Sequence, residues 1–497
     1  MNHKRRTASL IRGLIGITII TLISGWLGLP SKYAYAEPSI ETAKIDRFIQ
    51  SQMDHNQIPG LAVAVVHRDR TIYAKGFGIT GEGLPVTTKT PFAIASLSKS
   101  ITALAVMQLV EAGKINLDAP IATYIPSFKL ADPRGGNITV RQLLNHTSGL
   151  KDTHFPEMTF DTQPSTLEQS ITRMQDVKLA SHPGQQFHYH NPNYLILARL
   201  VEVVGQERFP DYLQKHIFQP LQMKHTFDIA NTEQFVEGDK PFSKGHILVY
   251  GKPVVTKEPE WFVDGSAGTV STVEDMAHWL KMQLNGGKHN GVQLFSSEGV
   301  KSMHSPAGVD IPYGMGWSIA GEKEKIFHNG LLWTYYAEQV LLPKSGYGIV
   351  VLYNSGFNPL VNYSSFTQGI SDILSGQEPE QPALHVQIVE IIIALITVVT
   401  VGIGIRRLLR LNQWEQTYHK RAKWVTWFFH LVTLIPLLLL MFFPQVLTFI
   451  AAGRVLSWER IILAMPSIFI WLVLAAVFSV VVVICRCARM YKMGKGA

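Results

Sequence analysis

The last quarter of this 497-residue chain contains three long apolar runs, which constrain its architecture more than any other feature. Residues 386–405, 424–451 and 461–484 are each long enough to cross about 30 Å of hydrocarbon at about 1.5 Å per residue. Pro436 and Pro444 in the second run predict kinks, which a membrane helix tolerates when neighbouring groups satisfy the freed carbonyls. We therefore expect three transmembrane helices.

Positive residues between these runs predict their orientation. The first connection and the C-terminal tail are rich in Lys and Arg, whereas the second connection carries only Arg454 and Arg460. Because positively charged loops stay in the cytoplasm, residues 37–385 are expected to lie outside it. The two cysteines, Cys485 and Cys487, fall at the cytoplasmic end of the last run, so the exported part requires no disulfide.

The N-terminus predicts the same topology independently. Residues 1–36 combine a positive start, an apolar stretch and an A-x-A pattern at residues 34–36, as a cleaved signal peptide does. An uncleaved N-terminal anchor is the alternative. Both deliver the following residues to the outside of the cytoplasm.

The charge of the chain follows from this topology. The formal net charge is +8 at pH 7, but the N-terminal region, the first connection and the tail together carry +13. The remaining residues therefore carry about −5 and lack the positive face that nucleic-acid binding requires. Membrane lipid is an expected partner through the three helices, nucleic acid is not, and no protein partner is indicated.

Residues 37–375 are expected to form one exported domain, and the Gly- and Pro-containing residues 376–385 a linker to the membrane. Helical periodicity predicts an opening helix over residues 45–53 and a last helix over residues 360–374. Short apolar, β-rich runs predict strands near both ends of the domain, at residues 61–66, 71–77, 316–320, 325–328, 335–342 and 348–353. Strands from both ends in one antiparallel sheet, with helices between them, predict an α+β fold.

Ser96 and Lys99 form the first motif that carries chemistry. They open a run of helical period, and positions three apart share a helix face, so Ser96 Oγ and Lys99 Nζ are expected to meet. A serine in the first turn also lies at the positive end of the helix dipole, which favours an alkoxide. A lysine acts as a base only where its surroundings lower its pKa well below about 10.4. Taken alone, S-x-x-K more often marks a helix cap followed by a surface lysine.

Tyr189 and Asn191 form the second motif. They are two residues apart, so on an extended segment both side chains would point to one face. A tyrosine there can move a proton between Ser96 and a leaving group, and an asparagine can hold Lys99 and a substrate amide. By itself, Tyr189 is more often a core aromatic residue with a tethered hydroxyl.

The third motif is His328-Asn329-Gly330 at the end of a predicted strand, followed by Leu331. Gly330 would let a substrate backbone approach the sheet edge, and the backbone N–H of Leu331 would join that of Ser96 in an oxyanion hole. His328 would offer a donor, or a positive charge below about pH 6.5, to a substrate carboxylate. Alone, it is more often a partly buried strand histidine.

Three histidines, His182, His188 and His190, are close in the sequence, yet no carboxylate or cysteine accompanies them at the spacing of a metal site. Serine chemistry requires no metal, so we expect neither a metal nor another cofactor. His146, within an H-T-S-G stretch, is interpreted as a residue that holds a loop, and Tyr313 as a core aromatic residue.

The order and spacing of these motifs resemble those of the serine β-lactamase and penicillin-binding protein superfamily, in its class C-like, peptidase S12-type branch. That branch includes D-alanyl-D-alanine carboxypeptidases and teichoic-acid D-alanyl esterases of the FmtA kind. The resemblance covers roughly residues 45–374. Further stretches contribute to it, namely residues 58–62, 143–150, 183–184, 220–223, 267–272 and 313–317.

The resemblance implies a β-lactamase/transpeptidase-like fold, with an antiparallel sheet, flanking helices and a helical subdomain. It implies that Ser96 attacks a carbonyl and forms an acyl-enzyme, while Lys99 and Tyr189 share the base work. Asn191 would support Lys99 and the substrate. His328 stands where many relatives have the lysine of K-T-G, with Gly330 as the motif glycine, and Leu331 follows where relatives usually have more glycines.

Together these features predict a membrane-anchored, extracytoplasmic serine hydrolase of a Gram-positive bacterial cell membrane, with a cytoplasmic C-terminus. Its expected substrates are D-alanyl peptide or ester groups of the envelope, in cell-wall or teichoic-acid-like polymers. A broad-specificity esterase or β-lactamase is the alternative within the same class. A non-catalytic envelope receptor or scaffold is the alternative of another class, but it would not require Ser96, Lys99, Tyr189 and Asn191 together.

Overall fold

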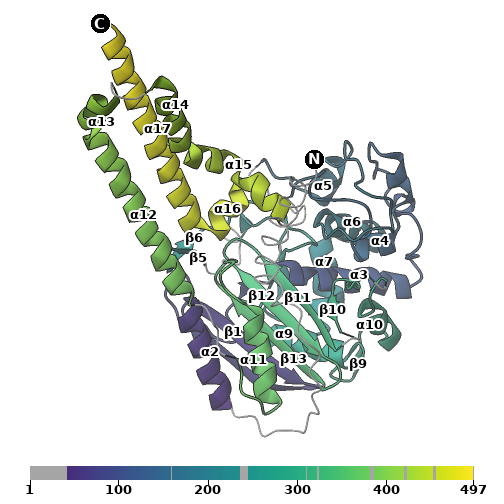
Figure 1. Cartoon of the computed structure of the whole chain (residues 1–497). Coiled ribbons are helices and arrows are strands. Elements are labelled where there is room, and N and C mark those ends of the chain that lie inside the picture. The colour runs from purple at the N-terminus through teal and green to yellow at the C-terminus, as the bar shows by residue number, and fades with distance from the viewer. Residues whose placement is uncertain are drawn as a thin grey trace, which may run out of the picture.

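The structure is a computed structural model. It describes residues 42–157, 159, 161–234, 244–308, 310–321, 324–380, 385–418, 422–450 and 455–495. The predicted signal peptide, residues 1–36, lies outside the described residues, as does part of the predicted linker. The described residues form an α+β domain and a group of long helices that extends away from it (Figure 1).

A six-stranded antiparallel sheet in the order β10-β11-β12-β13-β1-β2 is the centre of the domain. Its strands are β1 (Gly60–His67), β2 (Arg70–Gly78), β10 (Ser318–Ala320), β11 (Lys325–Leu331), β12 (Tyr336–Leu342) and β13 (Tyr347–Tyr353). β1 pairs with β13 from Leu61 opposite Tyr353 to His67 opposite Tyr347, so the two ends of the domain meet in the middle of the sheet. The predicted pairing of early and late strands is confirmed.

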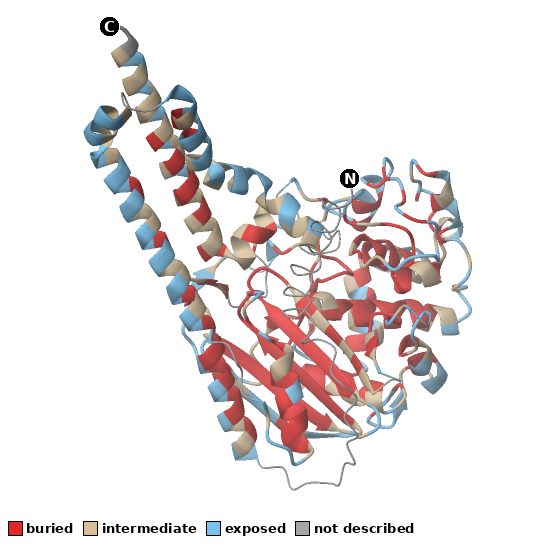
Figure 2. Cartoon of the chain, in the orientation of Figure 1, coloured by how far each residue is buried: buried red, intermediate tan, exposed pale blue. Residues whose placement is uncertain are grey.

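Helices cover both faces of this sheet. Along β1, Leu61, Val63 and Val65 pack against α2 (Thr42–Asn56) and α11 (Ser364–Leu374). The alternate residues of the strand join the larger core on the opposite face, where α9 (Val273–Leu284) lies. This alternation follows from the two-residue period of a strand, and Figure 2 shows the sheet buried on both sides.

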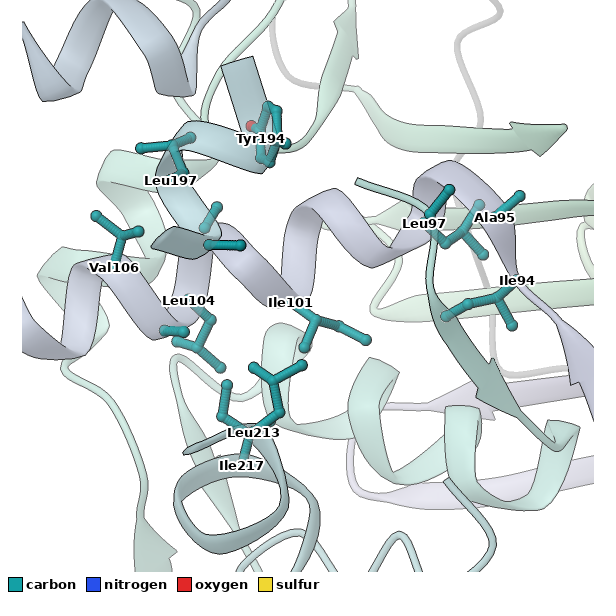
Figure 3. Close-up of a cluster of buried hydrophobic side chains, with 14 of the residues drawn as sticks. Ile94, Ala95, Leu97, Ile101, Leu104, Val106, Tyr194, Leu197, Leu213 and Ile217 are labelled. Carbon is teal, nitrogen blue, oxygen red and sulfur yellow. The ribbon is translucent and has the colours of Figure 1, made fainter. Parts of the chain in front are cut away.

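The larger core continues into a helical subdomain built around α3 (Ser98–Glu111). Almost all of α3 is buried, because most of its residues are apolar or small. Figure 3 shows side chains of α3 gathered with those of neighbouring helices, among them Leu104 with Leu213 and Ile217. The other helices of this region are α4 (Val140–Leu144), α5 (Leu167–Thr172), α6 (Pro192–Gly205), α7 (Phe209–Leu213), the π-helical turn η5 (Gln214–Phe218) and α10 (Ser297–Met303).

Short elements complete the domain. One small sheet has the order β3-β7-β4, and the remaining strands form two hairpins, β5–β6 and β8–β9. These strands are β3 (Phe92–Ala93), β4 (Phe227–Asp228), β5 (Gly245–Val249), β6 (Lys252–Thr256), β7 (Thr269–Ser271), β8 (Lys288–His289) and β9 (Val292–Gln293). The 3-10 helices are η2 (Ala95–Leu97), η3 (Ile121–Thr123) and η4 (Pro133–Asn137).

Two helices, α12 (Val386–Leu409) and α17 (Pro466–Lys495), are long and apolar enough to cross a membrane. Figure 2 shows α12 largely exposed, as expected for a helix whose surroundings are lipid. Between them lie α13 (Leu411–Tyr418), α14 (Lys423–Thr433), α15 (Ile435–Ile450) and α16 (Trp458–Ala464).

The middle apolar run is bent, and the last one begins later than predicted. α14 and α15 are bent by 41° relative to each other, and they give a third span only when the bent pair is taken as one membrane crossing. The bend lies just before Pro436. The predicted segment 461–484 is divided at Met465, because Pro466 lacks the N–H that would continue α16 and instead opens α17. α17 then continues to Lys495, beyond the predicted end.

The β5–β6 hairpin lies against α12 and α17, on the side of the domain. Tyr250 N, in the hairpin turn, donates to Ser467 Oγ of α17 at 2.8 Å. Ser467 Oγ in turn donates to Glu390 of α12 at 2.5 Å, and the Tyr250 hydroxyl lies 3.2 Å from Thr397 Oγ1. The hairpin therefore joins both long helices to the α+β domain.

Candidate active site

Ser96 lies in the sharp turn that joins β3 to α3. Ala95 has a left-handed φ of 49°, which is uncommon for a residue with a Cβ and marks a backbone held in place by its surroundings. Ser96 is the partly exposed residue of this turn, whereas Ile94, Ala95 and Leu97 are buried. The turn thus presents the Ser96 hydroxyl outward from a rigid core.

Lys99 lies one helical turn beyond Ser96, and its side chain is fully buried. Its Nζ is 2.9 Å from Ser96 Oγ, as the spacing of three residues predicts. Nζ also donates to Asn191 Oδ1 at 2.7 Å and to the backbone oxygen of Ser266 at 2.9 Å. The oxygen of Ser266 was not among the predicted residues, because no sequence pattern distinguishes a main-chain acceptor in a loop.

Asn191 and Tyr189 reach the site, but not from one extended segment. Asn191 has helical angles (φ −58°, ψ −39°) at the N-terminus of α6, so the extended geometry expected for residues 189–191 is wrong there. The ring of Tyr189 nevertheless lies over Lys99, with its centroid 5.0 Å from Nζ. The structure therefore brings Ser96, Lys99, Asn191 and the Tyr189 ring together.

β11 forms the opposite side of the site, because Gly330 allows it to pack against the Ser96 turn. A Cβ at Gly330 would lie 2.2 Å from Ile94 O and 3.1 Å from Ser96 N. Leu331 follows directly, and it lines a cavity of about 220 Å³ together with Ser96 and Asn191. The oxyanion hole, in which the backbone N–H groups of Ser96 and Leu331 would face the same oxygen, stays a prediction, and it requires this close approach of β11 to the Ser96 turn.

His328 does not have the predicted role of a cationic partner. It is buried, with Nε2 3.0 Å from the Tyr313 hydroxyl and Nδ1 2.7 Å from Asn329 O. Burial, followed by the charge of Lys99, lowers the pKa of His328 to about 3. The imidazole is therefore neutral near pH 6 and does not supply the expected positive charge, while its predicted role as a hydrogen-bond donor to a substrate stays a prediction.

His146 holds the loop beneath the site, as predicted. It is fully buried and has a left-handed φ of 59°. Its Nδ1 accepts from His190 N at 3.2 Å and lies 2.9 Å from Asn193 Nδ2, while its ring packs 4.4 Å from that of Tyr189. Burial lowers the pKa of His146 well below its usual range.

His190 has carboxylate neighbours that its sequence context did not predict. Asp152 and Glu157 bring oxygen atoms within 4.8 Å of one another and of a His190 ring nitrogen. The prediction that no carboxylate accompanies these histidines is therefore wrong for His190 in the folded chain, because both carboxylates come from a loop more than 30 residues earlier in the sequence. Arg460 forms ion pairs with both carboxylates in this structure.

A serine beside a buried lysine, on an antiparallel sheet with a helical subdomain, defines a serine hydrolase of the β-lactamase and transpeptidase fold. The chain belongs to the Beta-lactamase family, whose model matches residues 45–363.

Individual relatives agree with this assignment. The chain is 30% identical over 318 residues to "Protein flp" of Staphylococcus aureus strain MW2, a match that covers 63% of this chain and 62% of that protein. It is 27% identical over 316 residues to a protein of Escherichia coli O157:H7 described as a candidate D-alanyl-D-alanine carboxypeptidase, covering 56% of this chain and 72% of the relative.

Solved structures share the fold. An octameric penicillin-binding protein homologue from Pyrococcus abyssi has a TM-score of 0.58 and 29% identity, over 69% of this chain and 79% of the homologue. EstCE1, a hydrolase with promiscuous acyltransferase activity, has a TM-score of 0.57 and 20% identity, over 67% and 98% of the two chains. The predicted family is therefore confirmed.

Proposed function

We propose that this chain is a membrane-anchored, extracytoplasmic serine hydrolase that acts through an acyl-enzyme at Ser96 on D-alanyl peptide or ester groups of the bacterial envelope. The observation that carries the proposal is the 2.9 Å contact between Ser96 Oγ and Nζ of the fully buried Lys99. A buried amine so close to a hydroxyl can take its proton when the hydroxyl attacks.

These residues can carry out acylation and then deacylation of Ser96. Ser96 Oγ bonds to the substrate carbonyl carbon while its proton passes to Lys99, and the N–H groups of Ser96 and Leu331 stabilise the oxyanion. The bond to the leaving amine or alcohol then breaks as that group receives the proton, with Tyr189 as the relay. Water hydrolyses the acyl-enzyme by the same route and restores Ser96.

The membrane helices and the relatives support the envelope as the location of the substrate. α12 and α17 are suited to cross a bilayer, and an enzyme confined to a membrane surface meets an immobile polymer efficiently. The E. coli relative is described as acting on a D-alanyl-D-alanine peptide, which is the chemistry proposed for this chain. Asn191 lines the cavity, and its side-chain amide can hydrogen-bond to an amide group of a peptide substrate.

The test uses the full-length protein in detergent, exposed briefly to a labelled penicillin and then measured by intact mass and peptide mapping. Turnover of a D-alanyl ester is assayed in parallel, with Ser96→Ala as the control. A stable adduct on Ser96 is expected of a peptidase with slow deacylation. Ester turnover that depends on Ser96, without an adduct, indicates an esterase that rejects β-lactams. If neither an adduct nor ester turnover is observed, the proposal is overturned in favour of the scaffold hypothesis.

A further inference from the structure

Arg460 belongs to the connection between the second and third apolar runs, yet its side chain lies inside the hydrolase domain and is only 6% exposed. It is part of α16, which Figure 1 shows against the helical side of the domain. A charged side chain is rarely buried unless it is paired, so its partners indicate what it does.

The guanidinium of Arg460 is held by one loop of the hydrolase domain. Nη1 donates to Asp152 Oδ2 at 3.0 Å, and Nη2 donates to the backbone oxygen of Glu157 at 2.6 Å. Nη2 also lies 3.9 Å from Glu157 Oε1. Val455 N, from the same connection, donates to Asp152 Oδ2 at 3.0 Å. The connection is thus bonded to the domain through both its backbone and its side chain.

Glu157 links Arg460 to the reacting groups. Its Oε2 accepts a hydrogen bond from Asn191 N at 2.7 Å, and Asn191 Oδ1 accepts one from Lys99 Nζ at 2.7 Å. Glu157 also lines the same cavity as Ser96. A continuous series of polar contacts therefore runs from the membrane connection to the nucleophile.

The buried carboxylates of Asp152 and Glu157 explain why the contact with Arg460 is important. The side chains of Asp152 and Glu157 are 5% and 7% exposed, so two carboxylates lie in one buried place. A planar guanidinium can bond both at once, whereas removal of one partner leaves a buried charge uncompensated. Without Arg460, the loop that carries Glu157 would have to move, and Asn191 would lose its fixed position.

We propose that Arg460 is a positioning residue for the Ser96–Lys99 site: the connection between the membrane segments holds in place the loop whose Glu157 lines the active-site cavity. The proposal rests on the proposed function of Ser96 and Lys99. The connection that carries Arg460 would then contribute to catalysis as well as to membrane anchoring.

The first experiment measures kcat and KM of the full-length protein in detergent with a nitrophenyl ester. Arg460→Ala is expected to lower kcat on the order of 10- to 100-fold, with a smaller change in KM, since misplaced groups slow the chemical step. Arg460→Lys should recover part of the rate. The control is Arg489→Ala, which removes a 2.7 Å pair between α17 and Glu415 of α13, remote from the hydrolase domain, and should leave kcat unchanged.

The second experiment does not depend on activity. The midpoint of thermal unfolding is measured for Arg460→Ala, Asp152→Asn and the double variant. The effects of the two single changes should not add, because each removes the same buried contact. Additive effects would show that Arg460 and Asp152 do not interact, and would overturn the proposal.

Ser96→Ala separates this inference from the proposed function. Turnover that is lost in Ser96→Ala but unchanged in Arg460→Ala overturns the inference alone. Turnover that survives Ser96→Ala overturns the proposed function, and with it the role of Arg460.

Discussion

Lys99 is surrounded by three oxygen atoms, those of Ser96 Oγ, Asn191 Oδ1 and Ser266 O, all within 2.9 Å of its Nζ. A neutral amine has two N–H groups and one lone pair. Two of the oxygens can accept those N–H groups, and the lone pair can then face the Ser96 hydroxyl. An ammonium group would instead donate to all three oxygens, so the same surroundings accommodate Lys99 before and after it takes a proton.

Lys99→Arg should abolish this role, although it keeps the positive charge. A guanidinium has no lone pair available for a proton, so the rate of acylation of Ser96 is expected to fall by about 10²- to 10⁴-fold. The measurement is the rate of adduct formation with a labelled penicillin, or of ester turnover. Acylation at the parental rate would show that another group is the base.

His328 should make the domain sensitive to acid. Its pKa is lowered to about 3 by burial, whereas the ordinary value is 6.5. Between these values the unfolded chain binds a proton that the folded chain does not, so stability falls as the pH falls from 7 to 5. This residue contributes a loss of about 2 kcal/mol over that range.

The measurement is the free energy of unfolding at pH 7, 6 and 5 for the parent and for His328→Asn. The variant is expected to lose less stability on acidification than the parent does. His225→Asn, at an exposed histidine, is the matched control. Equal losses in the parent and in His328→Asn would contradict the assignment of a neutral, buried imidazole.

Sequence patterns were most informative where the geometry is local. The contact of Ser96 with Lys99 follows from helical spacing, and the structure confirms it. The backbone of Asn191 was predicted wrongly because Pro192 begins a helix directly after it. Arg460 and Glu157 are 303 residues apart, so only the fold reveals their contact.

At the scale of elements, the close approach of β11 to η2 depends on Gly330. Gly330→Ala should push the strand from the Ser96 turn, since its Cβ would be 2.2 Å from Ile94 O. Ester turnover is expected to fall at least about tenfold. Gly136→Ala is the control, because a Cβ there meets nothing within 4 Å and the φ is not left-handed. Equal turnover of the two variants would show that the strand can shift without affecting the site.

The regular strands were predictable because each is a short apolar, β-rich run, and β1 and β13 are buried on both faces of the sheet. The ladder of β1 with β13 is specified by such runs at both ends of the domain. Shorter elements such as β3 and η2 have two or three residues and no measurable period. The end of α16 was missed because a run of apolar residues continues through Pro466, and composition alone does not show a break.

For the molecule as a whole, the predicted topology can be tested with its two cysteines. Cys485 and Cys487 lie in α17, toward the end remote from the hydrolase domain. In intact cells they should react with a membrane-permeant maleimide but not with an impermeant one. The control is Lys301→Cys, at an exposed position of α10, in a chain whose native cysteines are replaced by serine; this residue should react with both. Labelling of the native cysteines by the impermeant reagent would contradict a cytoplasmic C-terminus.

The β5–β6 hairpin has a consequence for where such an enzyme can work. Because Tyr250 bonds to Ser467 at the start of α17, the hydrolase domain is held directly against the long helices. For a chain held in a bilayer by these helices, the catalytic serine would keep a nearly constant height above the lipid. Substrate groups of the polymer at that distance from the lipid would react, and groups further out would not. The enzyme would then select among chemically identical groups by their distance from the membrane.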